Sequence, residues 1–354
     1  MFEELTVIDC STVLAGPSVG TFFAELGARV LKIENPRNLD VTRSWKLPSE
    51  DKKVTISAYF SSINYKKSYQ QLDFKDSTDL EKLKELIKQA DVFISNFKKG
   101  DDIKFQLTDS DLFALNPTLI IGKISGFGED SDRVAYDLIL QAETGFMSMN
   151  GTPESGPVKM PVALIDVLCA HQLKEGLLLA LLNRTKNKKG QVVTVSLYDT
   201  AVASLANQAS NYLMEKHIPA RIGSLHPNIA PYGEIFETKD KKLITFAIGS
   251  NKHFDLFCRF LHLEKLLTDE RFKENISRVE NRIELFKILQ EVLSTFDSQT
   301  LCTHFNHVFV PCGIVKNLQE VFENPQSQCL IREEKIDGSH TKRVSQIAFQ
   351  IRSC

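Results

Sequence analysis

One acidic residue stands at the start of the most apolar helical stretch in the chain. Within residues 161–184, Asp166 lies between Ile165 and Val167. An aspartate at the head of such a run either caps the helix or does chemistry. We hypothesise that Asp166 is a catalytic nucleophile; for the segment taken alone, the cap remains the simpler alternative. The helix itself is predicted to have one buried face, formed by Val167, Ala170, Leu173, Leu177, Leu178, Leu181 and Leu182.

The surroundings of Asp166 fit the requirements of a nucleophilic carboxylate. Such a group must be ionised, and the N–H groups at a helix N-terminus favour the anion. Apolar neighbours limit the water that would hydrolyse an activated intermediate. A cap, by comparison, would contribute only about 1 kcal/mol of stability.

Composition argues against several other classes of protein. The chain has 354 residues and a net charge of -2, without the basic surplus of a nucleic-acid binder. No apolar stretch is long enough to span a membrane, and the first residues lead directly into a strand pattern, so we expect no signal peptide and a cytoplasmic location. The seven cysteines lack a CxxC pair and the histidines lack HExxH, which predicts neither a disulfide framework nor a metal site.

The elements that would position Asp166 alternate between strands and helices. Strands are expected at 5–9, 29–34, 91–95, 119–125 and 191–197. Helices are expected at 18–26, 79–89 (with Thr78 and Glu81 as a capping box), 110–115, 136–147 and 198–214. This alternation predicts a Rossmann-like parallel sheet. Ligands bind such sheets outside the carboxyl ends of the strands, and the loops that would share this edge are 13–16, 35–37, 96–99 and 125–128.

The first turn of this sheet contains Gly16 and Gly20 but lacks the G-x-G-x-x-G fingerprint, which disfavours the usual mode of dinucleotide binding.

Beyond residue 215 the pattern of alternating strands and helices changes. We expect a large α/β domain at 1–215 and a smaller α+β lobe with its linker at 216–325. The tail at 326–354 would return to the large domain, with a last strand at 344–351. The run His226–Tyr232 holds two prolines and suggests a linker or hinge, followed by a hairpin at 235–248.

With these elements in place, a series of motifs in order and spacing resembles the family III CoA-transferases. This group includes formyl-CoA transferase and carnitine CoA-transferase and is related to alpha-methylacyl-CoA racemase. The resemblance covers nearly the whole chain. The motifs are VIDCSTVLAGPSVGTFFAELGARVLKIENP, NYKKSYQQLDF, DVFISNFKKG, NPTLIIGKISGFGED, YDLILQAETGFMSMNG, the segment from Asp166 through NRTKNKKGQVVTVSLYD, HPNIAPYGEIF and VPCGIV.

The resemblance implies a covalent mechanism at Asp166, which matches the family's aspartate. The carboxylate would attack the thioester of an acyl-CoA, giving a mixed anhydride and CoA thiolate. The thiolate would then attack the aspartyl carbonyl, forming an aspartyl-CoA thioester and releasing the donor acid. An acceptor carboxylic acid would reverse these steps. No tightly bound cofactor is implied, because CoA and acyl-CoA are substrates.

The resemblance also implies a set of CoA-binding residues. Val13, Leu14 and Ala15 would line the adenine and pantetheine, and Asn96 would hold the ligand's backbone. Arg37 and Lys104 would face phosphates, while Leu72 and Lys75 would lie at the nucleotide end. Phe97 and Tyr136 complete the expected set.

The chain departs from the resembled proteins in three ways. Tyr136 precedes Asp137 where the racemase branch has His, which disfavours two-base proton exchange. The glycine run of formyl-CoA transferase is absent, which puts an oxalate or formate substrate in doubt. The further C-terminal stretch of most members is also missing after residue 354.

Three functions therefore stay open: an acyl-CoA:carboxylate CoA-transferase, a 2-methylacyl-CoA racemase or isomerase, and a non-catalytic CoA-binding homologue. The resemblance favours the first. It further implies an interlocked homodimer of ring-shaped chains.

Overall fold

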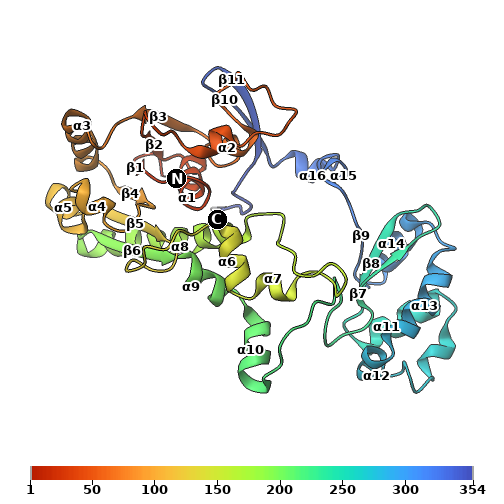
Figure 1. Ribbon diagram of the computed structural model, residues 1–354. Helices are drawn as coiled ribbons and strands as arrows, with labels where there is room; N and C mark the ends of the chain where they lie inside the picture. Colours follow the sequence, from red (N-terminus) through yellow and green to blue (C-terminus); the bar gives the residue numbers. More distant parts are fainter. Residues whose placement is uncertain (1, 353–354) are drawn as a thin grey trace. The chain divides into compact units, whose positions relative to one another are not determined.

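The computed structural model describes residues 2–352, which form two compact units (Figure 1). The larger unit contains residues 2–148, 158–219 and 328–352. The smaller contains Met149–Pro157 and Ala220–Ser327. The segment Met149–Pro157 belongs to the smaller unit, although it falls within the large domain expected at 1–215.

The larger unit is built on a six-stranded, all-parallel sheet in the order β3-β2-β1-β4-β5-β6 (Figure 1). This order confirms the Rossmann-like prediction. The strands are β1 (Thr6–Asp9), β2 (Arg29–Glu34), β3 (Lys67–Gln71), β4 (Val92–Ser95), β5 (Ile120–Ser125) and β6 (Gln191–Ser196). Strand β3 is not among the expected strands; its polar KSYQQ segment lies at the sheet edge and pairs only with β2.

Helices cover both faces of this sheet. The core of one face includes residues of α1 and α8, and that of the other face includes residues of α3 and α5. The helical segments are α1 (Ala15–Glu25), η1 (Val41–Ser44), α2 (Ala58–Ser62), α3 (Ser77–Lys88), α4 (Asp101–Lys104), α5 (Asp109–Leu115), α6 (Asp137–Glu143), α7 (Phe146–Met149), α8 (Leu164–Asn187), α9 (Leu197–Ala203) and α10 (Ala206–Glu215).

Two of these helices, α1 and α3, begin more than one residue from the expected start. α1 starts three residues early, at Ala15, because Pro17 falls in the first turn, where a missing N–H costs no hydrogen bond. The expected capping box of α3 is wrong. Asp76 is the N-cap instead, and its carboxylate accepts hydrogen bonds from the N–H groups of Thr78 and Asp79.

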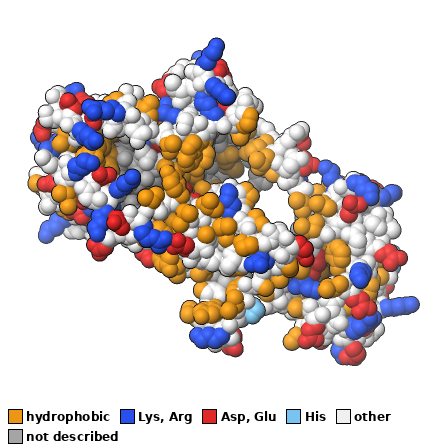
Figure 2. All heavy atoms as spheres, viewed as in Figure 1, with side chains coloured by type: hydrophobic (Ala, Val, Ile, Leu, Met, Phe, Trp, Pro, Cys, Tyr) orange, Lys and Arg blue, Asp and Glu red, His pale blue; other side chains and the backbone are white. Residues whose placement is uncertain are grey.

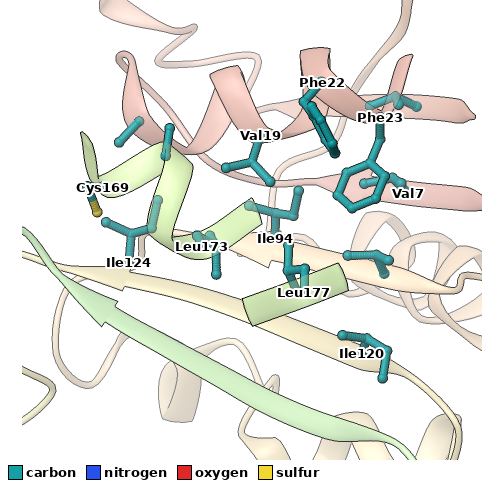
Figure 3. Close-up of a cluster of buried hydrophobic side chains, with 14 of the residues drawn as sticks. Val7, Val19, Phe22, Phe23, Ile94, Ile120, Ile124, Cys169, Leu173 and Leu177 are labelled. Carbon is teal, nitrogen blue, oxygen red and sulfur yellow. The ribbon is translucent and has the colours of Figure 1, made fainter. Parts of the chain in front are cut away.

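The helix that carries Asp166 packs closely on the sheet (Figure 3). Leu173 and Leu177 fill the space above Gly122 of β5, and a Cβ added at Gly176 would lie 2.5 Å from Val193 of β6. The buried face of α8 is narrower than expected, because Leu178 and Leu182 are 37% and 55% exposed.

The smaller unit combines an antiparallel sheet with a helical layer over a phenylalanine-rich core. Its strands β7 (Tyr232–Glu237) and β8 (Leu243–Ala247) form the expected hairpin, and β9 (Cys312–Ile314) pairs with β8. Its helical segments are α11 (Asn251–Phe260), η2 (Glu264–Leu267), α12 (Asn275–Glu280), α13 (Arg282–Leu293), α14 (Ser298–His307), α15 (Leu318–Phe322) and α16 (Pro325–Gln328).

The run His226–Tyr232 is fastened to this smaller unit. Arg278, fully buried, donates from Nε to the Ala230 carbonyl at 2.9 Å. Arg282 donates from Nη1 to the His226 carbonyl at 3.0 Å. These bonds hold the segment to the smaller unit at His226 and Ala230, and its role as a linker or hinge stays a prediction.

The C-terminal segment forms a hairpin in the larger unit, with strands β10 (Ile331–Ile336) and β11 (Ser339–Val344). The expected strand at 344–351 is wrong, because β11 ends at Val344 and Glu25 then accepts the N–H groups of Gln346 and Ile347. Arg343 also pairs with Glu25, at 2.5 Å. Within residues 2–352, no helix combines the length and apolar character needed to cross a membrane.

Candidate active site

Asp166 is the third residue of α8 and is 8% exposed. The N-cap position belongs to Ala163, which makes no side-chain capping bond. Asp137, the first residue of α6, supplies the missing acceptor: its Oδ1 accepts the Ile165 N–H at 2.8 Å. The alternative in which Asp166 is the N-cap is therefore wrong, because the carboxylate of Asp137 accepts the backbone N–H at this helix start.

A short chain of hydrogen bonds fixes the approach to Asp166. Gln141 donates from Nε2 to the second oxygen of Asp137 at 2.6 Å. The Oε1 of Gln141 accepts the Met160 N–H at 2.8 Å. Asp137 and Gln141, both buried, thus hold residues on both sides of the turn into α8, and so fix where Asp166 emerges.

Burial first, and then the charge of Asp137, raise the pKa of Asp166 to about 7. Moving a carboxyl pKa from 3.8 to about 7 corresponds to roughly 4 kcal/mol. The helix terminus favours the anion by only about 0.3–1 kcal/mol. The helix N-terminus therefore favours the anion of Asp166, as expected, but by less than burial and Asp137 disfavour it. Near neutral pH the acid and the carboxylate forms of Asp166 are therefore both present.

Tyr59 of α2 lies in the field of this acidic group. Burial, followed by the charges of Asp166, Asp137 and Asp40, raises the pKa of its phenol to about 12. The ring makes an edge-to-face contact with Trp45, with centroids 5.1 Å apart. At neutral pH the phenol therefore keeps its proton and is a hydrogen-bond donor close to the carboxylates.

A cavity of about 450 Å³ opens at the carboxyl ends of β4 and β5, where the parallel topology predicts ligand binding. Four of the expected CoA-binding residues line it: Val13, Asn96, Phe97 and Tyr136. Asn96 is already engaged there. Its Oδ1 accepts the Thr12 N–H and its Nδ2 donates to the Thr12 carbonyl, both at 3.0 Å, so it joins the loops after β1 and β4.

A second group of the expected residues gathers around Asp73. Arg37 pairs with the Asp73 carboxylate at 2.7 Å, and the Lys75 N–H donates to the same carboxylate at 3.1 Å. The Arg37 side chain is 75% exposed, so its cation is open to a ligand phosphate. Leu72 is buried in the core beneath this group, which leaves its side chain little surface for ligand contact.

A cluster of aromatic rings connects the two groups. Phe74 lies between Leu72 and Lys75 in sequence, and its ring contacts those of Phe97 and Phe105. Lys104 extends from the outer end of this cluster, its Nζ 5.5 Å from the Phe105 ring centroid. The remaining expected residues are less accessible: Ala15 is buried in the core, and Leu14 is half-buried.

Four residues of this site have no role among the expectations from the sequence: Asp137, Gln141, Asp40 and Tyr59. Asp137 and Gln141 carried one usable signal, an acid and an amide one helical turn apart just before the Asp166 segment. Asp40 and Tyr59 carried none, because the charges of Asp166 and Asp40 act on Tyr59 only in the folded chain.

Comparisons with known proteins give a consistent result over the whole chain. A family model described as "CoA-transferase family III" matches residues 2–353. The succinate–glutarate CoA-transferase of Agrobacterium fabrum is 35% identical over 92% of this chain and 82% of its own length. The succinyl-CoA:glutarate CoA-transferase of Mus musculus is 34% identical, over 92% and 74%. Among solved structures, a CAIB/BAIF family protein from Brucella suis has a TM-score of 0.84 and 33% identity, with 98% of this chain and 91% of that chain covered.

Proposed function

Because this chain belongs to the family III CoA-transferases, we propose that it moves CoA from an acyl-CoA to a carboxylic acid by covalent catalysis at Asp166. The Asp166 carboxylate attacks the donor thioester carbonyl, and CoA leaves as the thiolate. The thiolate then attacks the aspartyl carbonyl of the mixed anhydride, which releases the donor acid and leaves CoA on Asp166 as a thioester. An acceptor carboxylate takes CoA by the same steps in reverse.

The observation that carries this proposal is the state of Asp166. It is a buried carboxylate with a pKa of about 7, at a helix start whose capping bond is made by another residue. Asp166 is therefore not needed to cap its helix, and its carboxylate can exist as a weakly solvated anion at neutral pH. Burial also limits water, which would otherwise hydrolyse the anhydride.

The substrates proposed are short dicarboxylic acids and their CoA thioesters. This proposal comes from the relatives, whose names specify succinate, succinyl-CoA and glutarate. We propose that CoA lies along the carboxyl edge of the sheet. Its phosphates lie near Arg37, Lys75 and Lys104, and its pantetheine runs past the loop at Val13 toward Asp166.

Incubation with a donor alone should leave CoA attached to Asp166. The protein would be mixed with succinyl-CoA without acceptor, quenched in acid, digested and examined by mass spectrometry, with acetyl-CoA and a longer acyl-CoA run in parallel. We expect the peptide containing Asp166 to carry CoA as a thioester, and Asp166→Asn to carry none. CoA exchange between acids without an adduct on Asp166 would contradict the mechanism.

We further propose that the chain forms a homodimer, which the family resemblance implies to be interlocked. The surface at the end of α10 supports an assembly, because hydrophobic side chains gather there (Figure 2). Leu213, Met214 and Ile218 are 67%, 78% and 76% exposed. Light scattering after size exclusion should therefore give about twice the 40.0 kDa chain mass. A stable particle of one chain mass would exclude the dimer.

A further inference from the structure

The loop between β1 and α1 contains a conformation that its residue type disfavours. Val13 has φ of +72°, in the left-handed region. Within residues 2–352, it is the only β-branched residue with a positive φ. Such a conformation is a genuine outlier for valine and persists only where the surroundings enforce it.

Three buried or half-buried groups enforce this conformation from different elements. The Val13 N–H points to the Asp40 carboxylate, 3.3 and 3.4 Å from its two oxygens. Asn96, which follows β4, accepts a hydrogen bond from the Thr12 N–H and donates one to the Thr12 carbonyl. Lys32 of β2 donates from Nζ to the Ser11 carbonyl at 2.6 Å. Three consecutive residues of the loop are thus each held from outside it.

Asp40 is the member that acts on Val13 itself. Its side chain is fully buried and pairs with the equally buried Lys32 at 3.1 Å. It also accepts the Thr42 N–H at 3.1 Å and the Thr42 hydroxyl at 2.7 Å. Asp40 therefore cannot turn away from Val13 without losing an ion pair in the core. Val13, in turn, lines the cavity at the carboxyl edge of the sheet.

We propose that Asp40, paired with Lys32, is a positioning residue that holds Val13 in its left-handed conformation and so presents the loop to CoA. This inference rests on the proposed function, in which CoA passes this loop. The proposed role is indirect: Asp40 touches the backbone of Val13, and the loop touches the ligand. Without the carboxylate, valine returns to its ordinary conformations, and only a fraction of the molecules can bind.

The test measures binding of free CoA by calorimetry, alongside the thermal midpoint Tm. Asp40→Asn loses the ion pair with Lys32 that holds this side chain against Val13. It should therefore weaken CoA binding about tenfold, as expected when about one molecule in ten keeps the competent loop. Glycine adopts positive φ without steric cost, so Val13→Gly in the Asp40→Asn background should restore most of the affinity. Val13→Ala is the matched control: it also shortens the side chain but keeps the Cβ that disfavours this conformation, so it should restore little.

The outcomes separate this inference from its alternatives. Glu25→Gln breaks a similarly buried ion pair and should lower Tm while leaving the Kd for CoA unchanged. If Asp40→Asn fails to fold, Lys32→Met combined with Asp40→Asn removes both charges and should show the same weakened binding and the same rescue by glycine. Unchanged affinity in the Asp40 variants, or equal rescue by glycine and alanine, would overturn the inference while leaving the proposed function intact. Absence of CoA binding by the unmodified protein would overturn both.

Discussion

Asp166→Asn is expected to abolish CoA transfer, lowering the rate by at least about 10³-fold, while the protein remains folded. Asparagine has nearly the same shape as aspartate, but its amide cannot attack a thioester to form an anhydride. Transfer would be measured as the appearance of glutaryl-CoA from succinyl-CoA and glutarate. The matched control is Asp91→Asn, which removes the carboxylate of an ion pair with Arg184 at the opposite edge of the sheet and should keep its activity. A variant that still transfers CoA at a tenth of the original rate would exclude Asp166 as the nucleophile.

The same substitution should stabilise the protein at alkaline pH. A loss of activity in a variant that is more stable cannot be attributed to misfolding. The folded protein holds the Asp166 proton up to a pKa of about 7, against 3.8 for an unperturbed carboxyl. The native state therefore binds more protons than the unfolded chain across this range, and its stability falls as pH rises from about 4 to about 7. A neutral amide avoids this loss. Asp166→Asn should be more stable at pH 8 by about 1–4 kcal/mol, and the difference should disappear below about pH 4.

Much of the fold could be predicted from the sequence because its signals are local. Apolar runs such as the one ending at Asp9 define central parallel strands, and their alternation with helices leaves few topologies. The expectations failed where local signals conflict with tertiary pairing. β3 is polar because it lies at the sheet edge, and the last strand was placed beyond Val344 because alternation alone does not show where pairing ends.

In the candidate site, too, some residues could be predicted from local sequence and others depend on tertiary contacts. Asp166 could be found because an acid is conspicuous at the head of an apolar helix. Asp137 and Asp40 could not be assigned roles, because their effects depend on contacts across 28 and 27 residues of sequence. The raised pKa of Asp166 was equally hidden. Sequence shows a helix N-terminus, which favours the anion, whereas burial and a second carboxylate are visible only in the folded structure.

The raised pKa of Asp166 leads to a distinctive pH dependence. The nucleophile must be ionised, and kcat/KM reports the ionisation of the free enzyme. We therefore expect kcat/KM for the donor acyl-CoA to fall about tenfold per pH unit on the acid side of pH 7. With an ordinary carboxyl pKa, the rate would stay flat down to about pH 4. A profile that is flat from pH 8 to pH 5 would contradict the ionisation described for Asp166.

Asp137→Asn tests the cause of this shift. Asparagine keeps an oxygen that can accept the Ile165 N–H, but it removes the charge that helps to raise the pKa of Asp166. The acid limb of kcat/KM should therefore move to lower pH, although burial, the larger cause, keeps it above the ordinary carboxyl range. Phosphate groups of CoA also titrate near pH 6, but both enzymes share this contribution, so the difference between the profiles isolates Asp166.

The position of the limb, rather than the height of the profile, decides the role of Asp137. In the Asp137→Asn variant the introduced amide nitrogen would face the donor group of Gln141, so some loss of rate at every pH is expected from disturbed packing. A purely structural role for Asp137 would lower the whole profile and leave the limb unmoved. A charge acting on the nucleophile moves the limb. Asp91→Asn, whose carboxylate is no cause of the Asp166 shift, should leave the limb in place.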